Sequence, residues 1–234
     1  MKILHIFPDI MNLYGEYANL SILKRFLNEC GHEVSIETLS LYEDKDISGF
    51  DMYYMGAGTE ENLHLACDSL IKYQDTLSKA MNTNRVILFT GNAMEALGQR
   101  ITDKEGKTYT GLGLFEYTSE ESDKRVTFDS VSELDNQTIV GFINKCSSTR
   151  GVVKPLFHVL MGQGDNKDIK TEGAQNNNCL GTHLTGPLLV KNPYILKKIA
   201  YILTKDESVI KHEIPEQEAS YSITAQALKD RMKA

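Results

Sequence analysis

A short apolar strand followed by a sharp turn is the part of the sequence that most suggests chemistry. Residues 86–89 form an apolar run typical of a buried strand, and residues 94–98 resemble the start of a helix. Only residues 90–93 separate the two segments. A strand that turns this sharply holds its turn residue in a strained conformation, with helix-terminal N–H groups converging in front of it. In a nucleophile elbow that residue is Ser or Cys. Here it is Gly91, so the pattern predicts an elbow without its nucleophile.

Three other side chains are alternatives for the missing nucleophile. Thr90 adjoins Gly91, but the period-two alternation of a strand points its side chain to the other face. Cys67 and Cys146 are possible displaced nucleophiles, and Cys146 is the better of the two because we expect residues 144–147 to form a loop. A buried or bystander thiol is the simpler interpretation of both cysteines.

The first half of the chain alternates between strand and helix patterns, which must position the turn. We expect strands at residues 2–7, 33–39, 51–55 and 85–90, with helices at 16–29 and 62–81. This rhythm predicts a doubly wound parallel sheet covered by helices on both faces. Ligands of such sheets bind beyond the carboxyl ends of the strands, where residues 56–58 and 91–92 would lie.

The second half changes character. Residues 101–108 carry a hairpin signal, and residues 112–161 suggest short strands and polar loops, as in an antiparallel extension. A strand at 179–184 and helices at 193–203 and 216–232 follow. No linker is long enough to divide the chain, so we expect one domain over residues 1–234, ending in the helix at 216–232.

Composition excludes several classes of protein. A net charge of −7 and a pI near 5.4 argue against nucleic-acid binding, which needs clustered Lys and Arg. No apolar stretch approaches the roughly 20 residues that span a bilayer, and the N-terminus resembles a first strand. The four cysteines and six histidines are scattered without metal-binding spacing. We therefore expect a cytoplasmic protein with reduced cysteines and no metal site.

Five segments, in order, resemble motifs of the class I (triad-type) glutamine amidotransferases. The resemblance is greatest to the CobB/CobQ-like members, which include the amidotransferase subunits of lipid II isoglutaminyl synthase and of cobyric acid synthase. The segments are residues 12–19 for Asn-Leu-Tyr-x-Asp-x-Gly-Asn, 55–58 for a strand-ending Gly-Gly-Gly, 91–98 for Cys-Gly-Gly-x-Gln-x-Leu-Gly, 141–144 for Gly-Phe-Glu-Asn, and 180–187 for Leu-Gly-Thr-Tyr-Leu-His-Gly-Pro. The resemblance covers essentially the whole chain and implies a flavodoxin-like fold.

The chain departs from these motifs at the reacting centre. Gly91 stands at the position of the catalytic Cys, and Thr185 at that of the catalytic His. The other departures are Glu95 for Gln, Ile143 and Lys145 for Glu and His, and Asn62-Leu63 for Glu-Gln. The resemblance therefore implies that no catalytic residue is intact.

The resemblance also implies a relic of the family's pocket. Backbone N–H groups form the family's oxyanion hole, and here they would belong to Asn92 and to a residue near Ala57 or Gly58. Arg125 would contact an anionic group or a partner subunit, unless it is a solvated surface residue. His183 would lie near the old His position, unless it is an ordinary polar strand residue. The predicted relic pocket comprises Gly56, Ala57, Gly58, Asn92, Glu95, Arg125, Asn144 and His183.

Three hypotheses for function follow. The first is a degenerate amidotransferase subunit that partners or regulates a Mur-ligase-like ATP-dependent synthetase in the amidation of the cell-wall precursor lipid II. The partner would then carry ATP and Mg²⁺, and this chain would need no cofactor. The second is an active glutamine-hydrolysing amidotransferase, of the lipid II or cobyric acid type, with a displaced nucleophile. The third is a binding module for glutamine or a similar small ligand.

Overall fold

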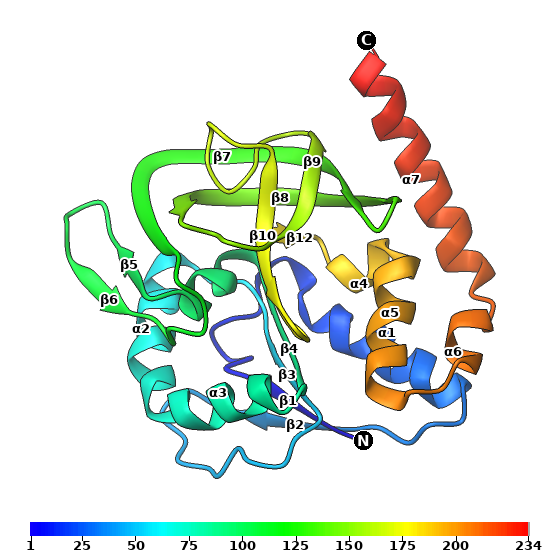
Figure 1. Ribbon diagram of the computed structural model, residues 1–234, viewed down its shortest axis with the longest axis horizontal. Helices are drawn as coiled ribbons and strands as arrows, with labels where there is room; N and C mark the ends of the chain where they lie inside the picture. The colour runs from blue at the N-terminus through cyan, green and yellow to red at the C-terminus, as the bar shows by residue number, and fades with distance from the viewer. Residues whose placement is uncertain (234) are drawn as a thin grey trace.

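The structure, a computed structural model, describes residues 1–233, so that Ala234 lies outside the described residues. Five parallel strands form its centre (Figure 1). They are β1 (Lys2–Ile6), β2 (Ser35–Leu39), β3 (Met52–Met55), β4 (Val86–Thr90) and β11 (Cys179–Thr182). Their spatial order is β2-β1-β3-β4-β11, with every neighbouring pair parallel. This is the flavodoxin-like order of a doubly wound sheet. The predicted fold class is confirmed.

Helices cover both faces of this sheet. One face packs against α1 (Tyr17–Glu29), α4 (Leu188–Lys191) and α5 (Pro193–Thr204), and the other against α2 (Glu60–Leu70) and α3 (Gln74–Asn82) (Figure 1). Successive strand residues point to opposite faces, so Ile3 packs with the first group of helices and Leu4 with the second. Short 3₁₀ helices η1 (Leu13–Gly15), η2 (Ile71–Tyr73) and η3 (Gly91–Leu97) complete this half.

The antiparallel extension continues the same sheet in the order β11-β10-β9-β7-β8-β12. Its strands are β7 (Thr118–Leu134), β8 (Gln137–Arg150), β9 (Pro155–Met161), β10 (Thr171–Asn176) and β12 (Leu184–Thr185), and the predicted hairpin appears as β5 (Arg100–Thr102) and β6 (Thr108–Thr110). The prediction of short strands over residues 112–161 was wrong for β7 and β8, which have 17 and 14 residues. Residues 122–125 are polar and exposed, so they resembled a loop, but pairing with β8 on either side keeps them extended.

The helix predicted at residues 62–81 is divided. It begins earlier, with Thr59 as the N-cap that accepts a hydrogen bond from the N–H of Asn62 (3.1 Å). It then breaks at η2, where Tyr73 leaves helical geometry with φ −103° and ψ 5°. The break turns the chain so that the Tyr73 hydroxyl donates to the carbonyl of Glu43 (3.1 Å) while Leu77 still reaches the core.

The strand predicted at residues 179–184 is also interrupted. β11 ends at Thr182, His183 lies outside any strand, and β12 pairs with β8 rather than extending β11. Side chains replace a neighbouring strand as hydrogen-bond partners here. Glu172 accepts from the N–H of His183 (2.6 Å), and the hydroxyl of Thr182 accepts from the N–H of Leu184 (3.0 Å). His183 and Thr185 therefore do not belong to one continuous strand.

The chain ends in α6 (Ser208–Lys211) and α7 (Pro215–Lys233), the latter close to the predicted 216–232. α7 projects from the body of the molecule and buries only Ala225 and Leu228 (Figure 1). The Tyr221 hydroxyl donates to the carbonyl of Thr138 (2.7 Å), which holds α7 on the start of β8, just after the β7–β8 turn. Among the helices of residues 1–233, none has both the length and the apolar composition that a transmembrane helix requires.

Candidate functional site

The elbow is present and its turn residue is crowded. β4 ends at Thr90 and η3 begins directly at Gly91, earlier than the helix start predicted near residue 94. Gly91 has φ +64°, in the left-handed region that favours glycine. A Cβ atom at this position would lie 2.5 Å from Ala57 Cβ and 3.0 Å from Thr185 Cγ2. The space in which a nucleophile would begin is therefore filled by side chains of these two residues.

The glycine loop after β3 is tied to the elbow by Asn92. The Asn92 side chain accepts a hydrogen bond from the N–H of Gly58 (3.0 Å) and donates one to the carbonyl of Gly58 (3.0 Å). The Asn62 amide fixes the same region by donating to the carbonyl of Ile10 (2.9 Å). The Gly58 N–H, which the resemblance placed near the oxyanion hole, is thus already bonded within the protein.

A buried polar network that the sequence did not predict lies beside the elbow. The Thr90 hydroxyl donates to the carboxylate of Glu16 and lies 3.0 Å from the Tyr54 hydroxyl. Asn19 donates to the same Tyr54 hydroxyl (2.8 Å). Burial raises the pKa of Glu16, while hydrogen bonds from Thr90, Tyr54 and Gly186 oppose that effect. The only sequence signal was that Glu16 stands at the Asp of the motif at residues 12–19.

The two cysteines considered as displaced nucleophiles are poorly suited to the task. Cys67 is buried on α2, and burial raises its pKa to about 12. Cys146 lies on β8, so the loop expected at residues 144–147 is wrong. Burial, together with the nearby Glu60 carboxylate, raises the pKa of Cys146 to about 12 as well. Both sulfurs are therefore thiols near neutral pH, and the thiolate is the nucleophilic form.

Arg125 lies in a cleft of about 650 Å³ between the start of α2, the β5–β6 hairpin and β7. Its guanidinium donates to the Glu60 carboxylate (2.7 Å) and to the Asn144 side-chain oxygen (2.9 Å). The Asn144 amide in turn donates to the Tyr14 hydroxyl (2.8 Å). The cleft lining carries six carboxylates against the two cations Lys104 and Arg125. The anionic group that Arg125 contacts is therefore internal to the chain.

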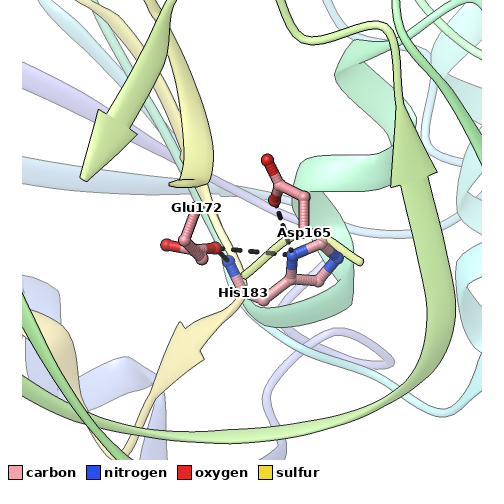
Figure 2. Close-up of side chains that lie close together, drawn as sticks. All are labelled: Asp165, Glu172 and His183. Carbon is pink, nitrogen blue, oxygen red and sulfur yellow. Dashed lines mark hydrogen bonds and ion pairs between the residues drawn. The ribbon is translucent and has the colours of Figure 1, made fainter. Parts of the chain in front are cut away.

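Glu95 and His183 meet in a closed cluster of charged side chains. Figure 2 shows three members of this cluster, Asp165, Glu172 and His183. His183 Nε2 lies 3.5 Å from Glu95 Oε1, and His183 Nδ1 lies 3.4 Å from Glu172 Oε1 and 3.6 Å from Asp165 Oδ1. Lys145 joins them, donating to the carbonyls of Gly164 (3.1 Å) and Asp165 (2.8 Å). All five residues are at most 2% exposed. Only Glu95 and His183 had been singled out as pocket residues in the sequence.

Charge in this cluster is strongly coupled. Burial and the Lys145 ammonium act to lower the pKa of His183. The carboxylates of Asp165, Glu172 and Glu95 have the larger, opposite effect, so that the pKa is raised to about 10. Burial lowers the pKa of Lys145. Burial raises the pKa of Asp165. Asp165 and Glu172 come from a polar segment that matches no motif, so their contribution could be found only from the folded chain.

The predicted site residues thus separate into three groups. The first group lies at the carboxyl ends of β3 and β4 and around the elbow, and comprises Gly56, Ala57, Gly58, Gly91, Asn92 and Thr185. The second group, at the acidic cleft, is Arg125 and Asn144. The third group, in the buried cluster, is Glu95 and His183. Elbow, glycine loop and parallel strand order together define an amidotransferase-type α/β fold. The chain belongs to the CobB/CobQ-like glutamine amidotransferase domain family, whose model matches residues 2–193. The predicted family is confirmed.

Comparison with individual proteins agrees with this family. The chain is 30% identical over 203 residues to subunit GatD of the glutamine-hydrolyzing lipid II isoglutaminyl synthase of Staphylococcus aureus (strain N315), covering 85% of this chain and 84% of that one. It is 28% identical over 197 residues to subunit GatD from Streptococcus pneumoniae (strain ATCC BAA-255 / R6), covering 82% and 76%.

Solved structures share the fold at low sequence identity. A crystal structure of a glutamine amidotransferase superposes with a TM-score of 0.59 at 13% identity, covering 86% of this chain and 98% of that chain. The structure of PurLQS from Thermotoga maritima gives a TM-score of 0.57 at 12% identity, covering 90% and 97%.

Proposed function

We propose that this protein is a GatD-like subunit that does not hydrolyse glutamine and that partners or regulates a Mur-ligase-like synthetase in lipid II amidation. The similarity to two GatD subunits of lipid II isoglutaminyl synthase supports the pathway and the existence of a partner. The synthetase would carry ATP and Mg²⁺. We also propose that the chain is one domain, because a single sheet joins its parallel and antiparallel halves.

The observation that carries the loss of hydrolysis is the filled elbow. Gly91 provides no nucleophile, and Ala57 and Thr185 occupy the space around its missing Cβ. Removing a catalytic Ser or His alone costs a triad enzyme on the order of 10⁶ in rate. Asn92 compounds the loss, because its side chain takes the Gly58 N–H that could otherwise stabilise an oxyanion. Other backbone N–H groups of the pocket remain, but without a nucleophile no oxyanion forms for them to stabilise.

Two contacts argue against the alternative functions. The Thr90 hydroxyl is bonded to Glu16, so it is not free to replace the missing nucleophile. A glutamine-binding module would need a cation for the amino acid's carboxylate, and Arg125 already pairs with Glu60.

The proposal is tested with the purified chain and a Mur-ligase-like synthetase from the same organism. We expect the two to co-elute at micromolar concentration, and the complex to amidate lipid II with free ammonia but not with glutamine. Ammonia release from glutamine should stay at background with or without the synthetase.

Two results would contradict the proposal. Failure of the proteins to associate would remove the partnership. Glutaminase activity above background would remove the loss of hydrolysis, and the variants Thr90→Val, Cys67→Ala and Cys146→Ala would then identify a displaced nucleophile. Activity that survives all three substitutions together would require a nucleophile elsewhere in the chain.

A further inference from the structure

The buried cluster contains several residues that differ from the family's motifs. Glu95, Lys145 and His183 stand where those motifs have Gln, His and Tyr, and all three lie in the cluster with Asp165 and Glu172. They come from η3, β8, the segment before β10, β10 itself and the residue after β11. The folded chain has thus gathered five ionisable side chains at one buried point beside the elbow.

Several atoms of this cluster have no hydrogen-bond partner. They are His183 Nδ1, His183 Nε2, Glu95 Oε2 and Asp165 Oδ2. A buried polar group without a partner is unfavourable, because it has given up its hydrogen bonds to water and gained none in return. Isolated cases occur in native proteins, but His183 Nδ1 and the Asp165 carboxylate lie side by side, and two such groups together point to a bound group between them.

The distances within the cluster are longer than those of direct hydrogen bonds and fit a metal ion. His183 Nδ1 lies 3.4 Å from Glu172 Oε1 and 3.6 Å from Asp165 Oδ1, and the three side chains offer ligand atoms within 4.8 Å of one another (Figure 2). Hydrogen bonds from nitrogen to oxygen are about 2.7–3.2 Å long. Two ligands at about 2.1 Å from a tetrahedral zinc ion lie about 3.4 Å apart. The two separations between His183 and the carboxylates therefore fit the edges of a tetrahedral coordination shell.

The surroundings of the three ligands also fit a metal site. Glu95 lies 3.5 Å from His183 Nε2, on the far side of the ring from Asp165 and Glu172. A carboxylate at the second nitrogen of a histidine ligand fixes its tautomer and ring orientation. The ligand carboxylates are held too, because Asp165 accepts from the N–H of Gly173 (3.0 Å) and Glu172 from the hydroxyl of Thr182 (2.7 Å).

Charge balance is compatible with a divalent ion. Metal binding displaces the proton from His183, and with that neutral histidine three carboxylates and the Lys145 ammonium leave two negative charges in a cluster whose residues are at most 2% exposed. Uncompensated buried charge is strongly unfavourable. One divalent cation brings the sum to zero. The hydrogen bonds of Lys145 leave the carboxylate oxygens available to the ion, because this residue donates to the backbone carbonyls of Gly164 and Asp165.

We propose that His183 Nδ1, Asp165 and Glu172 bind a zinc ion, with Glu95 orienting the histidine. The sequence predicted no metal site, because these ligands lack the close spacing of known motifs. Buried in this way, the ion would enter during folding and would join the segment around Asp165 and β10 to the end of β11. Its role would be structural. The proposal is independent of the proposed function.

The test is metal content and metal-dependent stability of the full-length protein. Chain unfolded in denaturant with a chelator, then refolded with one equivalent of zinc, should retain about one zinc per chain after desalting. Refolding with cobalt should give the visible absorption of a tetrahedral site with nitrogen and oxygen ligands. At a hundredfold excess of free zinc over its dissociation constant, stability should rise by about 2.7 kcal/mol.

Variants separate this site from surface binding. His183→Gln and Asp165→Asn should lose the metal, Glu95→Gln should bind it about 10–100-fold more weakly, and the control His64→Gln, outside the cluster, should be unchanged. If the ligand variants fail to fold, the wild-type refolding measurements still decide. Wild-type protein that refolds equally well with zinc or with chelator and retains no metal would overturn the proposal. The cluster would then be a buried imidazolium held by carboxylates.

Discussion

At residue 91 the backbone has φ +64°, a conformation that glycine adopts without the cost that a Cβ imposes. An enzyme accepts that cost because the side chain performs the reaction. Here Gly91 and Ala57 fit as a pair, since the methyl group of one occupies the space that the other leaves. The elbow can thus be kept as a structural turn after the nucleophile is gone.

A double-mutant cycle measures this fit. We expect Gly91→Ala to destabilise the protein by more than the roughly 1–3 kcal/mol of backbone strain, because the new Cβ would lie 2.5 Å from Ala57 Cβ. Ala57→Gly should recover the steric part but not the strain, giving a coupling energy of at least about 0.5 kcal/mol. Urea unfolding of the four proteins gives these values.

Gly106→Ala is the matched control for strain alone. Gly106 also has positive φ (+87°), but a Cβ atom added there would have no other atom within 4 Å. We expect Gly106→Ala to cost less than Gly91→Ala. Equal costs at the two positions, with no coupling to Ala57, would show that crowding at the elbow is not significant.

Single residues were predictable where a motif carried them. The sequence identified Gly91 and Thr185 and the need for a glycine at the turn, and the positive φ agrees with that need. The contacts of Arg125 and His183 could not be predicted, because their partners Glu60, Asp165 and Glu172 belong to other segments. Which carboxylate meets which cation depends on how the strands pair, and local sequence does not encode that.

At the scale of elements, burial decided what could be predicted. β1, β3 and β4 were recognisable because they are apolar runs buried on both faces. β7 was not recognisable, since its polar, exposed middle stays extended only through the neighbouring pairing with β8. The break between β11 and β12 likewise depends on Glu172, a side chain of another strand.

Strand β1 carries one titratable side chain within its buried run, and it makes stability depend on pH. His5 is 6% exposed, and burial lowers its pKa to about 4. The unfolded chain, with a histidine pKa of about 6.5, therefore binds the proton more readily. Protonation of His5 therefore does not reduce the free energy of unfolding above about pH 6.5, and reduces it progressively as the pH drops toward 4.

We expect wild-type protein to lose about 2 kcal/mol between pH 7.5 and pH 5 through His5, and His5→Gln to lack that loss. Urea midpoints of both proteins at the two pH values give the difference. Other groups, including Glu16 with its raised pKa, titrate in both proteins and cancel in the comparison. A pH dependence that is identical in the two proteins would show that His5 can be protonated in the folded state.

At the scale of the whole molecule, the chain has the fold of its amidotransferase family, and the proposed loss of hydrolysis rests on several separate contacts around the elbow. The flavodoxin-like strand order and the glycine loop match the family, while the elbow is filled, the Gly58 N–H is bonded to Asn92, and Arg125 is paired with Glu60. These changes lie in separate segments. Restoring a catalytic residue at one of these positions leaves the other changes in place. Activity should therefore stay low in a repurposed scaffold, whereas an enzyme that lost only its nucleophile should recover it.

The double variant Gly91→Cys, Thr185→His tests that distinction. We expect glutaminase activity at least about a hundredfold below that of an active relative, since a misplaced catalytic group costs about that much. The thiol-bearing Cβ would lie 2.5 Å from Ala57 Cβ, so adding Ala57→Gly should improve folding more than activity. Asn92 would still hold the Gly58 N–H in both variants. Ammonia release, compared at equal folded fraction, measures the effect. Full recovery in the double variant would mean that the pocket still binds glutamine productively, and the protein would then be better described as a glutamine sensor that kept its site and lost only the reaction.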